Sequence, residues 1–79
     1  MNNEKQAKIF QSQYNYLEKQ ANYLYNKIDE YDRIIKFQAN EFTDDEYKAF
    51  EENYDKVLNQ IEEIETSMEN LYKMIRELD

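Results

Sequence analysis

The sequence predicts an all-α fold: one antiparallel two-helix hairpin with coiled-coil-like packing, which we expect to assemble into a dimeric four-helix bundle. Apolar residues recur at spacings of three and four along two long stretches, and the phase of this repeat breaks once, between residues 39 and 46. The 79 residues also include no Gly and no Pro, the two residues that most often interrupt helices. We therefore expect a single helical hairpin over residues 1–79.

The first expected helix covers about residues 3–39, and ten of its positions form one stripe. These positions are Ala7, Phe10, Tyr14, Leu17, Ala21, Leu24, Ile28, Tyr31, Ile35 and Gln38. A repeat of three and four places all of these side chains on one face of an α-helix. Only Gln38 is polar, so we expect this stripe to form half of the core.

The second expected helix covers about residues 44–78 and repeats the same pattern. Its stripe consists of Tyr47, Phe50, Tyr54, Val57, Ile61, Ile64, Met68, Leu71, Ile75 and Leu78. Folding the chain at Thr43 brings the two stripes together in an antiparallel register that sets Leu24 opposite Ile61. This register uses nearly the whole chain, so we expect no second domain.

One continuous helix is the alternative to a hairpin, and the break in the repeat argues against it. Continuing the first stripe would place Phe42, Asp45 and Ala49 in the core. The second stripe instead starts at Tyr47, so the phase of the repeat changes in between. We therefore expect a turn at about residues 40–43.

The residues after the break carry the signals that start a helix. Thr43 can cap the helix N-terminus while Glu46 reaches back to it, a pattern known as a capping box. Phe42 and Tyr47 occupy the two positions of a hydrophobic staple. No Gly is available to end the first helix, so we expect Asn40 to leave it in a left-handed conformation.

We expect the hairpin to associate, because a core of this size rarely contributes more than roughly 3–5 kcal/mol without a metal or a disulfide. One side, which we call the neutral flank, carries a single charge: Gln6, Gln13, Gln20, Lys27, Ile34, Asn53, Gln60, Ser67 and Met74. Beside it, outside the core stripe, runs a row that only Glu30 interrupts and that we call the aromatic row: Ile9, Tyr16, Tyr23 and Phe37. The aromatic row and Ile34 are the predicted oligomerisation surface. The alternative is a set of scattered surface residues, since tyrosine tolerates water.

The opposite side of the hairpin is acidic. Residues 1–42 carry equal numbers of positive and negative side chains, so the net charge of −8 lies in residues 43–79. The register brings carboxylates near one another in three pairs: Asp32 and Glu51, Glu18 and Glu65, and Glu4 and Asp79. We define the acidic face by six carboxylates and three apolar anchors: Asp32, Glu51, Asp55, Glu62, Glu65, Glu69, Tyr25, Leu58 and Tyr72. A basic partner would relieve the repulsion between the carboxylates, whereas the alternative is a solvated face that keeps the protein soluble.

The residue types argue against chemistry on this chain. It has no His and no Cys, the residues most used in acid–base and nucleophilic catalysis. Glu62, Glu65 and Glu69 face outward and lack the Glu-x-x-His pairing of di-iron bundles. We therefore expect no enzyme activity, no specific metal site and no cofactor.

Charge and hydropathy narrow the class of partner. The net charge of −8 argues against direct binding of nucleic acid or of an anionic membrane, since both need clustered Lys and Arg. No stretch approaches about 18 consecutive apolar residues, so we expect no membrane span. The absence of Cys excludes the disulfides that small secreted domains use, which favours a cytoplasmic protein.

These features together predict a non-enzymatic protein–protein interaction module. The first hypothesis is a small acidic regulator or antagonist that covers a basic surface on another protein, such as one that binds nucleic acid. An AT-rich phage or mobile element would be a natural source of this composition. The alternative hypothesis is a self-assembling structural, scaffold or chaperone-like helical protein.

Overall fold

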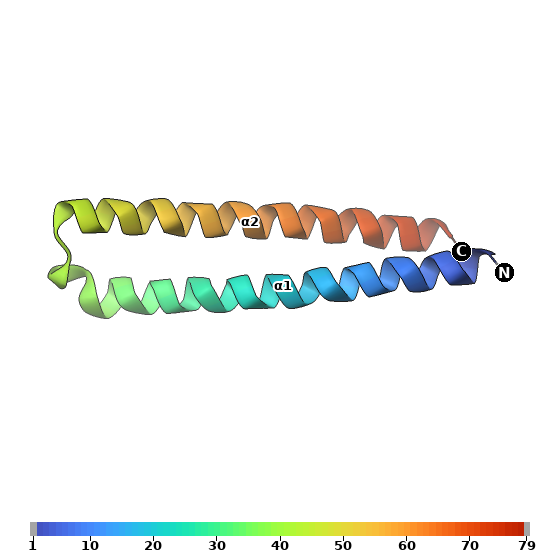
Figure 1. Ribbon diagram of the computed structural model, residues 1–79, viewed down its shortest axis with the longest axis horizontal. Coiled ribbons are helices and arrows are strands. Elements are labelled where there is room, and N and C mark those ends of the chain that lie inside the picture. Colours follow the sequence, from blue (N-terminus) through green and yellow to red (C-terminus); the bar gives the residue numbers. More distant parts are fainter. Residues whose placement is uncertain (1, 79) are drawn as a thin grey trace.

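The computed structural model describes residues 2–78 and has two long helices that lie side by side and antiparallel (Figure 1). Helix α1 covers Asn2–Gln38, a short 3-10 helix η1 covers Ala39–Glu41, and helix α2 covers Asp44–Glu77. The two termini lie together at one end of the hairpin, and the turn lies at the other. The molecule measures 60 × 15 × 13 Å. The predicted all-α helical hairpin is confirmed.

The predicted stripes face each other and form the core. Ala21, Leu24, Val57 and Ile61 are the buried hydrophobic residues, and they lie near the middle of each helix. Leu24, Val57 and Ile61 form one cluster, against which flanking residues of both helices pack. The shared cluster of Leu24 and Ile61, and the ring pair of Tyr31 and Tyr54, agree with the predicted antiparallel register. The other predicted core positions are half-buried, apart from two at the turn.

Gln38 and Tyr47, the expected last layer of the core beside the turn, are both exposed. A terminal layer has a neighbouring layer on one side only, so its side chains are covered less. The ring of Phe42 covers the end of the core instead: it lies 5.7 Å from the ring of Phe50, and Phe42 is half-buried. This ring contact lies one helical turn beyond Tyr47, the residue that the predicted staple pairs with Phe42.

Aromatic rings continue the core behind this end layer. The ring of Tyr31 lies 5.1 Å from that of Phe50 in an edge-to-face arrangement, and 6.2 Å from that of Tyr54. Edge-to-face pairs are favourable because the positive edge of one ring meets the negative face of the other. Ring packing therefore joins α1 to α2 between the buried cluster and the turn.

The chain leaves α1 through η1 and not through a left-handed residue. No described residue has a positive φ, so the expectation of a left-handed Asn40 is wrong. The amide of Phe42 donates to the carbonyl of Ala39 at 3.2 Å, and Phe42 itself is extended at φ −87° and ψ 139°. A 3-10 turn satisfies carbonyls at a helix end with bonds between residues three apart, and it needs no left-handed backbone.

Thr43 caps the N-terminus of α2 as predicted. Its backbone is extended at φ −71° and ψ 166°, and its hydroxyl oxygen accepts a hydrogen bond from the amide of Glu46 at 3.2 Å. Glu46 also reaches back to Thr43 as predicted, and the donor there is the Thr43 hydroxyl, which donates to the Glu46 carboxylate at 3.1 Å, where the usual capping box has the backbone amide of the cap residue. The side-chain cap satisfies one of the amides that the first turn of a helix leaves without a partner.

We expect Thr43→Ala to lower the free energy of unfolding by about 1 kcal/mol, because it removes this N-cap. Thr66→Ala is the matched control, since the Thr66 hydroxyl donates to the Glu62 carbonyl inside α2 and Ala has the higher helix propensity. That variant should keep or raise the stability. Urea denaturation followed by circular dichroism measures both variants. Equal losses would contradict the assignment of Thr43 as the N-cap.

Candidate protein-interaction surfaces

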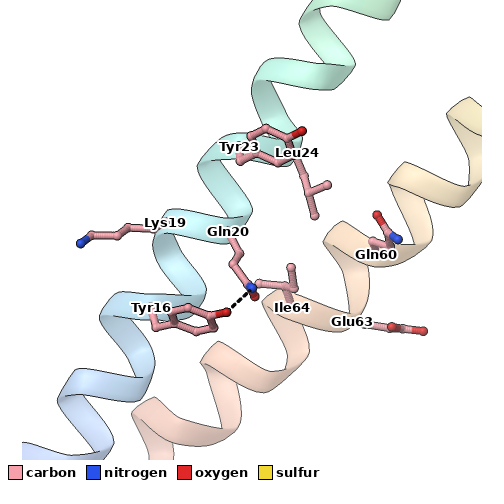
Figure 2. Close-up of a pocket in the computed structure, with 8 residues that line it drawn as sticks. All are labelled: Tyr16, Lys19, Gln20, Tyr23, Leu24, Gln60, Glu63 and Ile64. Carbon is pink, nitrogen blue, oxygen red and sulfur yellow. Dashed lines mark hydrogen bonds between the residues drawn. The ribbon is translucent and has the colours of Figure 1, made fainter.

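The neutral flank holds an open groove between the two helices, about 530 Å³ in volume (Figure 2). Its lining consists of Tyr16, Lys19, Gln20, Tyr23, Leu24, Gln60, Glu63 and Ile64. Leu24 is buried and Ile64 is half-buried, whereas Tyr16 and Tyr23 are 62% and 61% exposed. The groove is therefore an extension of the core to the surface, with exposed rings on one side of it.

Polar contacts hold the α1 side of this groove in place. The side-chain amide of Gln20 donates to the hydroxyl oxygen of Tyr16 at 2.9 Å, as Figure 2 shows. The ammonium nitrogen of Lys27 lies 5.3 Å from the centre of the Tyr23 ring, a cation–π contact. Lys27 is the single charged residue of the neutral flank, and its ammonium group is attracted to the negative face of the Tyr23 ring.

The aromatic row is exposed along α1. Ile9 and Phe37 are 49% and 73% exposed, and they extend the row beyond Tyr16 and Tyr23 in both directions. Ile34, between the row and the core, is half-buried. A second, smaller depression is lined by Ser12, Gln13, Tyr16, Leu17 and Leu71, and it shares Tyr16 with the groove. The structure thus brings the central part of the predicted oligomerisation surface next to hollows that reach the core.

The acidic face is open to solvent. All six of its carboxylate residues are exposed, and so are its anchors Tyr25, Leu58 and Tyr72. In residues 2–78 the one ion pair joins Lys73 to Glu69 at 3.5 Å, and both belong to α2. No ion pair therefore joins the two helices within the described part of the chain. The expected proximity of Glu4 to Asp79 lies outside the described residues.

Two tyrosine hydroxyls link the helices where ion pairs are absent. The Tyr25 hydroxyl donates to Oε1 of Glu65 at 2.7 Å, and the Tyr54 hydroxyl donates to Oδ1 of Asp32 at 3.0 Å. Each bond raises the pKa of the phenol above its ordinary value of 10.0, because the carboxylate accepts from the neutral hydroxyl and repels the phenolate. Two of the predicted partner-binding carboxylates thus already have a donor from the other helix.

The acidic face has its own groove, which periodicity alone did not reveal. It is lined by Tyr14, Tyr25, Glu65, Met68, Glu69 and Tyr72. Tyr14 and Met68 were predicted only as core residues, and both are half-buried. Their positions at the edge of the stripe, next to the acidic flank, were the available signal. The guanidinium carbon of Arg76 lies 5.8 Å from the centre of the Tyr72 ring.

In residues 2–78, no group of three or more His, Cys, Asp or Glu side chains is arranged to hold a metal ion. No helix in that part of the chain combines the length and the apolar character that crossing a membrane requires. No known protein family matches the chain, and neither does any curated protein or solved structure.

The raised pKa values of Tyr25 and Tyr54 predict a loss of stability at alkaline pH. A phenol whose pKa is higher in the folded state stabilises the fold fully below the unfolded value of about 10, and this stabilisation disappears as the pH rises through the folded value. Urea denaturation of wild type and of Tyr25→Phe with Tyr54→Phe, between about pH 8 and pH 11, measures this dependence.

At about pH 8 the double variant should have a lower free energy of unfolding than wild type, and the loss of the Tyr54 bond should account for about 0.5–1 kcal/mol of this difference. The difference between the two proteins should shrink above about pH 10. Tyr23→Phe removes a hydroxyl from the other side of the hairpin, and it should leave the alkaline loss in place. A difference between the double variant and wild type that stays constant with pH would rule out this account of the two bonds.

Proposed function

We propose that this chain is a non-enzymatic protein–protein interaction module, a small acidic regulator or antagonist that binds a basic surface of a partner protein through its acidic face. One observation carries the proposal: the carboxylates of this face are exposed, and no ion pair joins them to a cation of α1 within residues 2–78. The hairpin thus leaves much of its net charge of −8 on one side for an external cation.

Two further features support binding to a basic protein. The apolar anchors Tyr25, Leu58 and Tyr72 are 42%, 42% and 54% exposed among the carboxylates, so a partner could bury apolar surface as well as charge. Long-range attraction between opposite charges speeds association and decreases with salt. A partner that normally binds nucleic acid would present a suitable basic surface. We also propose that the protein acts in the cytoplasm.

Affinity capture from the source cells tests the acidic face. We expect wild type to retain proteins with basic surfaces at low salt, and Glu62→Lys with Glu65→Lys to lose them. Glu52→Lys with Glu77→Lys makes the same change in charge elsewhere on α2, at two exposed positions, and should retain them. Mass spectrometry identifies the captured proteins, and circular dichroism checks that each variant is helical.

Capture that does not change with ionic strength would contradict the proposal. Equal losses with both pairs of substitutions would also contradict it, because they would mean that net charge alone, and not this face, attracts the partner.

Self-assembly into a dimeric four-helix bundle is the second candidate, as for a structural, scaffold or chaperone-like protein. The groove between α1 and α2 and the aromatic row favour it, since both expose apolar surface on the side with the least charge. A stable interface buries about 800 Å² on each partner, which is roughly an eighth of the 6582 Å² of accessible surface here. A second copy lying along one side of a molecule 60 Å long could bury that area.

Substitutions on the aromatic row test this second candidate. Tyr16→Glu with Tyr23→Glu should convert a dimer to a monomer, because it places charge on the apolar contact. Asn22→Glu with Asn26→Glu adds the same charge at exposed positions elsewhere on α1 and should leave the dimer intact. Light scattering coupled to size-exclusion chromatography measures the mass. A wild-type monomer at all concentrations, or dimers in both variants, would count against this interface.

A further inference from the structure

The groove on the acidic face differs in chemistry from the groove on the neutral flank. The acidic groove has two carboxylates, Glu65 and Glu69, and three tyrosine rings in its lining. The groove on the neutral flank has one carboxylate, Glu63, together with the ammonium group of Lys19 and two amides. An occupant of the acidic groove therefore meets more negative charge and more aromatic surface, which together favour a cation.

The floor and the sides of the acidic groove suit different parts of a long basic side chain. Tyr14 and Met68 are half-buried, so they offer apolar surface to a methylene stem. Tyr25 and Tyr72 are exposed and come from opposite helices, so their rings can contact a charged end group. Because the Tyr25 hydroxyl donates to Glu65 at 2.7 Å, one ring and one carboxylate are already held together before a partner binds.

The chain's own cations already use these groups. The guanidinium carbon of Arg76 lies 5.8 Å from the centre of the Tyr72 ring, and the ammonium of Lys73 lies 3.5 Å from Glu69. Both members of the Lys73–Glu69 pair are more than 60% exposed, at 62% and 68%. Exposed pairs of this kind are weak and exchange readily, so an incoming cation can replace them.

We propose that this groove receives an arginine side chain of the basic partner, with its methylene stem on Tyr14 and Met68 and its guanidinium between the tyrosine rings and Glu69. Arginine fits better than lysine, because its planar guanidinium stacks on rings and can donate two parallel bonds to one carboxylate. The inference rests on the proposed function and names the group by which the acidic face recognises its partner.

Short peptides test this groove without knowledge of the partner. The probes are acetyl-Ala-Arg-Ala-amide and the same peptide with citrulline, which has nearly the shape of arginine but no charge. We expect the arginine peptide to shift the amide resonances of residues around the acidic groove in nitrogen-edited NMR spectra, with saturation at millimolar concentration. The citrulline peptide should bind at least about fivefold more weakly.

Variants of two lining residues separate the contribution of an aromatic ring to peptide binding from that of a carboxylate. Tyr72→Leu and Glu69→Gln should each weaken the arginine peptide by roughly threefold to fivefold. Tyr72→Phe keeps the ring and should keep most of the affinity, and Glu52→Gln removes one exposed carboxylate of α2 outside the groove and should leave the affinity unchanged. Tyr72 is 54% exposed, so its replacement should leave the hairpin folded, and the NMR spectrum of each variant checks this.

Three outcomes would overturn the proposal: equal binding of the citrulline peptide, shifts spread evenly over all carboxylates, or equal losses with Glu52→Gln and Glu69→Gln. Failure here is distinguishable from failure of the proposed function. Capture that depends on Glu62 and Glu65, without a preference of the arginine peptide for the groove, would overturn the arginine site alone. A groove that binds the arginine peptide, with no charge-dependent capture, would overturn the regulator hypothesis instead.

Discussion

Two helices packed side by side bury only the stripe along which they touch, and this limit shapes the whole protein. The buried hydrophobic residues are Ala21, Leu24, Val57 and Ile61, all near the middle of the hairpin. Every other core position is half-buried or exposed, because no further long helix covers the two stripes within residues 2–78. The core is therefore long and thin: the molecule extends to 60 Å, and its other dimensions are 15 and 13 Å. Both sides of the core then lie close enough to the surface to form grooves.

The two sides of the hairpin differ because charge is distributed unequally around and between the helices. The neutral flank, with the aromatic row beside it, leaves apolar rings next to amides, so a second copy meets little repulsion there. The acidic face concentrates carboxylates of α2, and a second copy of the same face would be repelled. The proposed self-association and the proposed binding of a basic partner would therefore use opposite sides of the molecule. The two proposed functions are compatible for this reason.

Tyrosine has two effects in this hairpin that a purely aliphatic core would lack. Its rings fill the interface at Tyr31 and Tyr54, while its hydroxyls reach the edge of the core and find carboxylates of the other helix. The bonds from Tyr25 to Glu65 and from Tyr54 to Asp32 join α1 to α2 along the acidic face, where no ion pair does so within residues 2–78. They also hold rings and carboxylates together on the surface where we propose that a guanidinium binds.

The two helices, the stripe that each one buries, the cap at Thr43 and the members of each side could all be predicted from the residues alone, because they follow from spacing along one chain. The 3-10 exit from α1, the exposure of Gln38 and Tyr47, and the hydroxyl bonds of Tyr25 and Tyr54 became visible only in the folded chain. The same is true of the two grooves, which combine residues of both helices. These features depend on distances between side chains of different helices, and a periodic pattern specifies which residues share a face but not how far each side chain reaches across it.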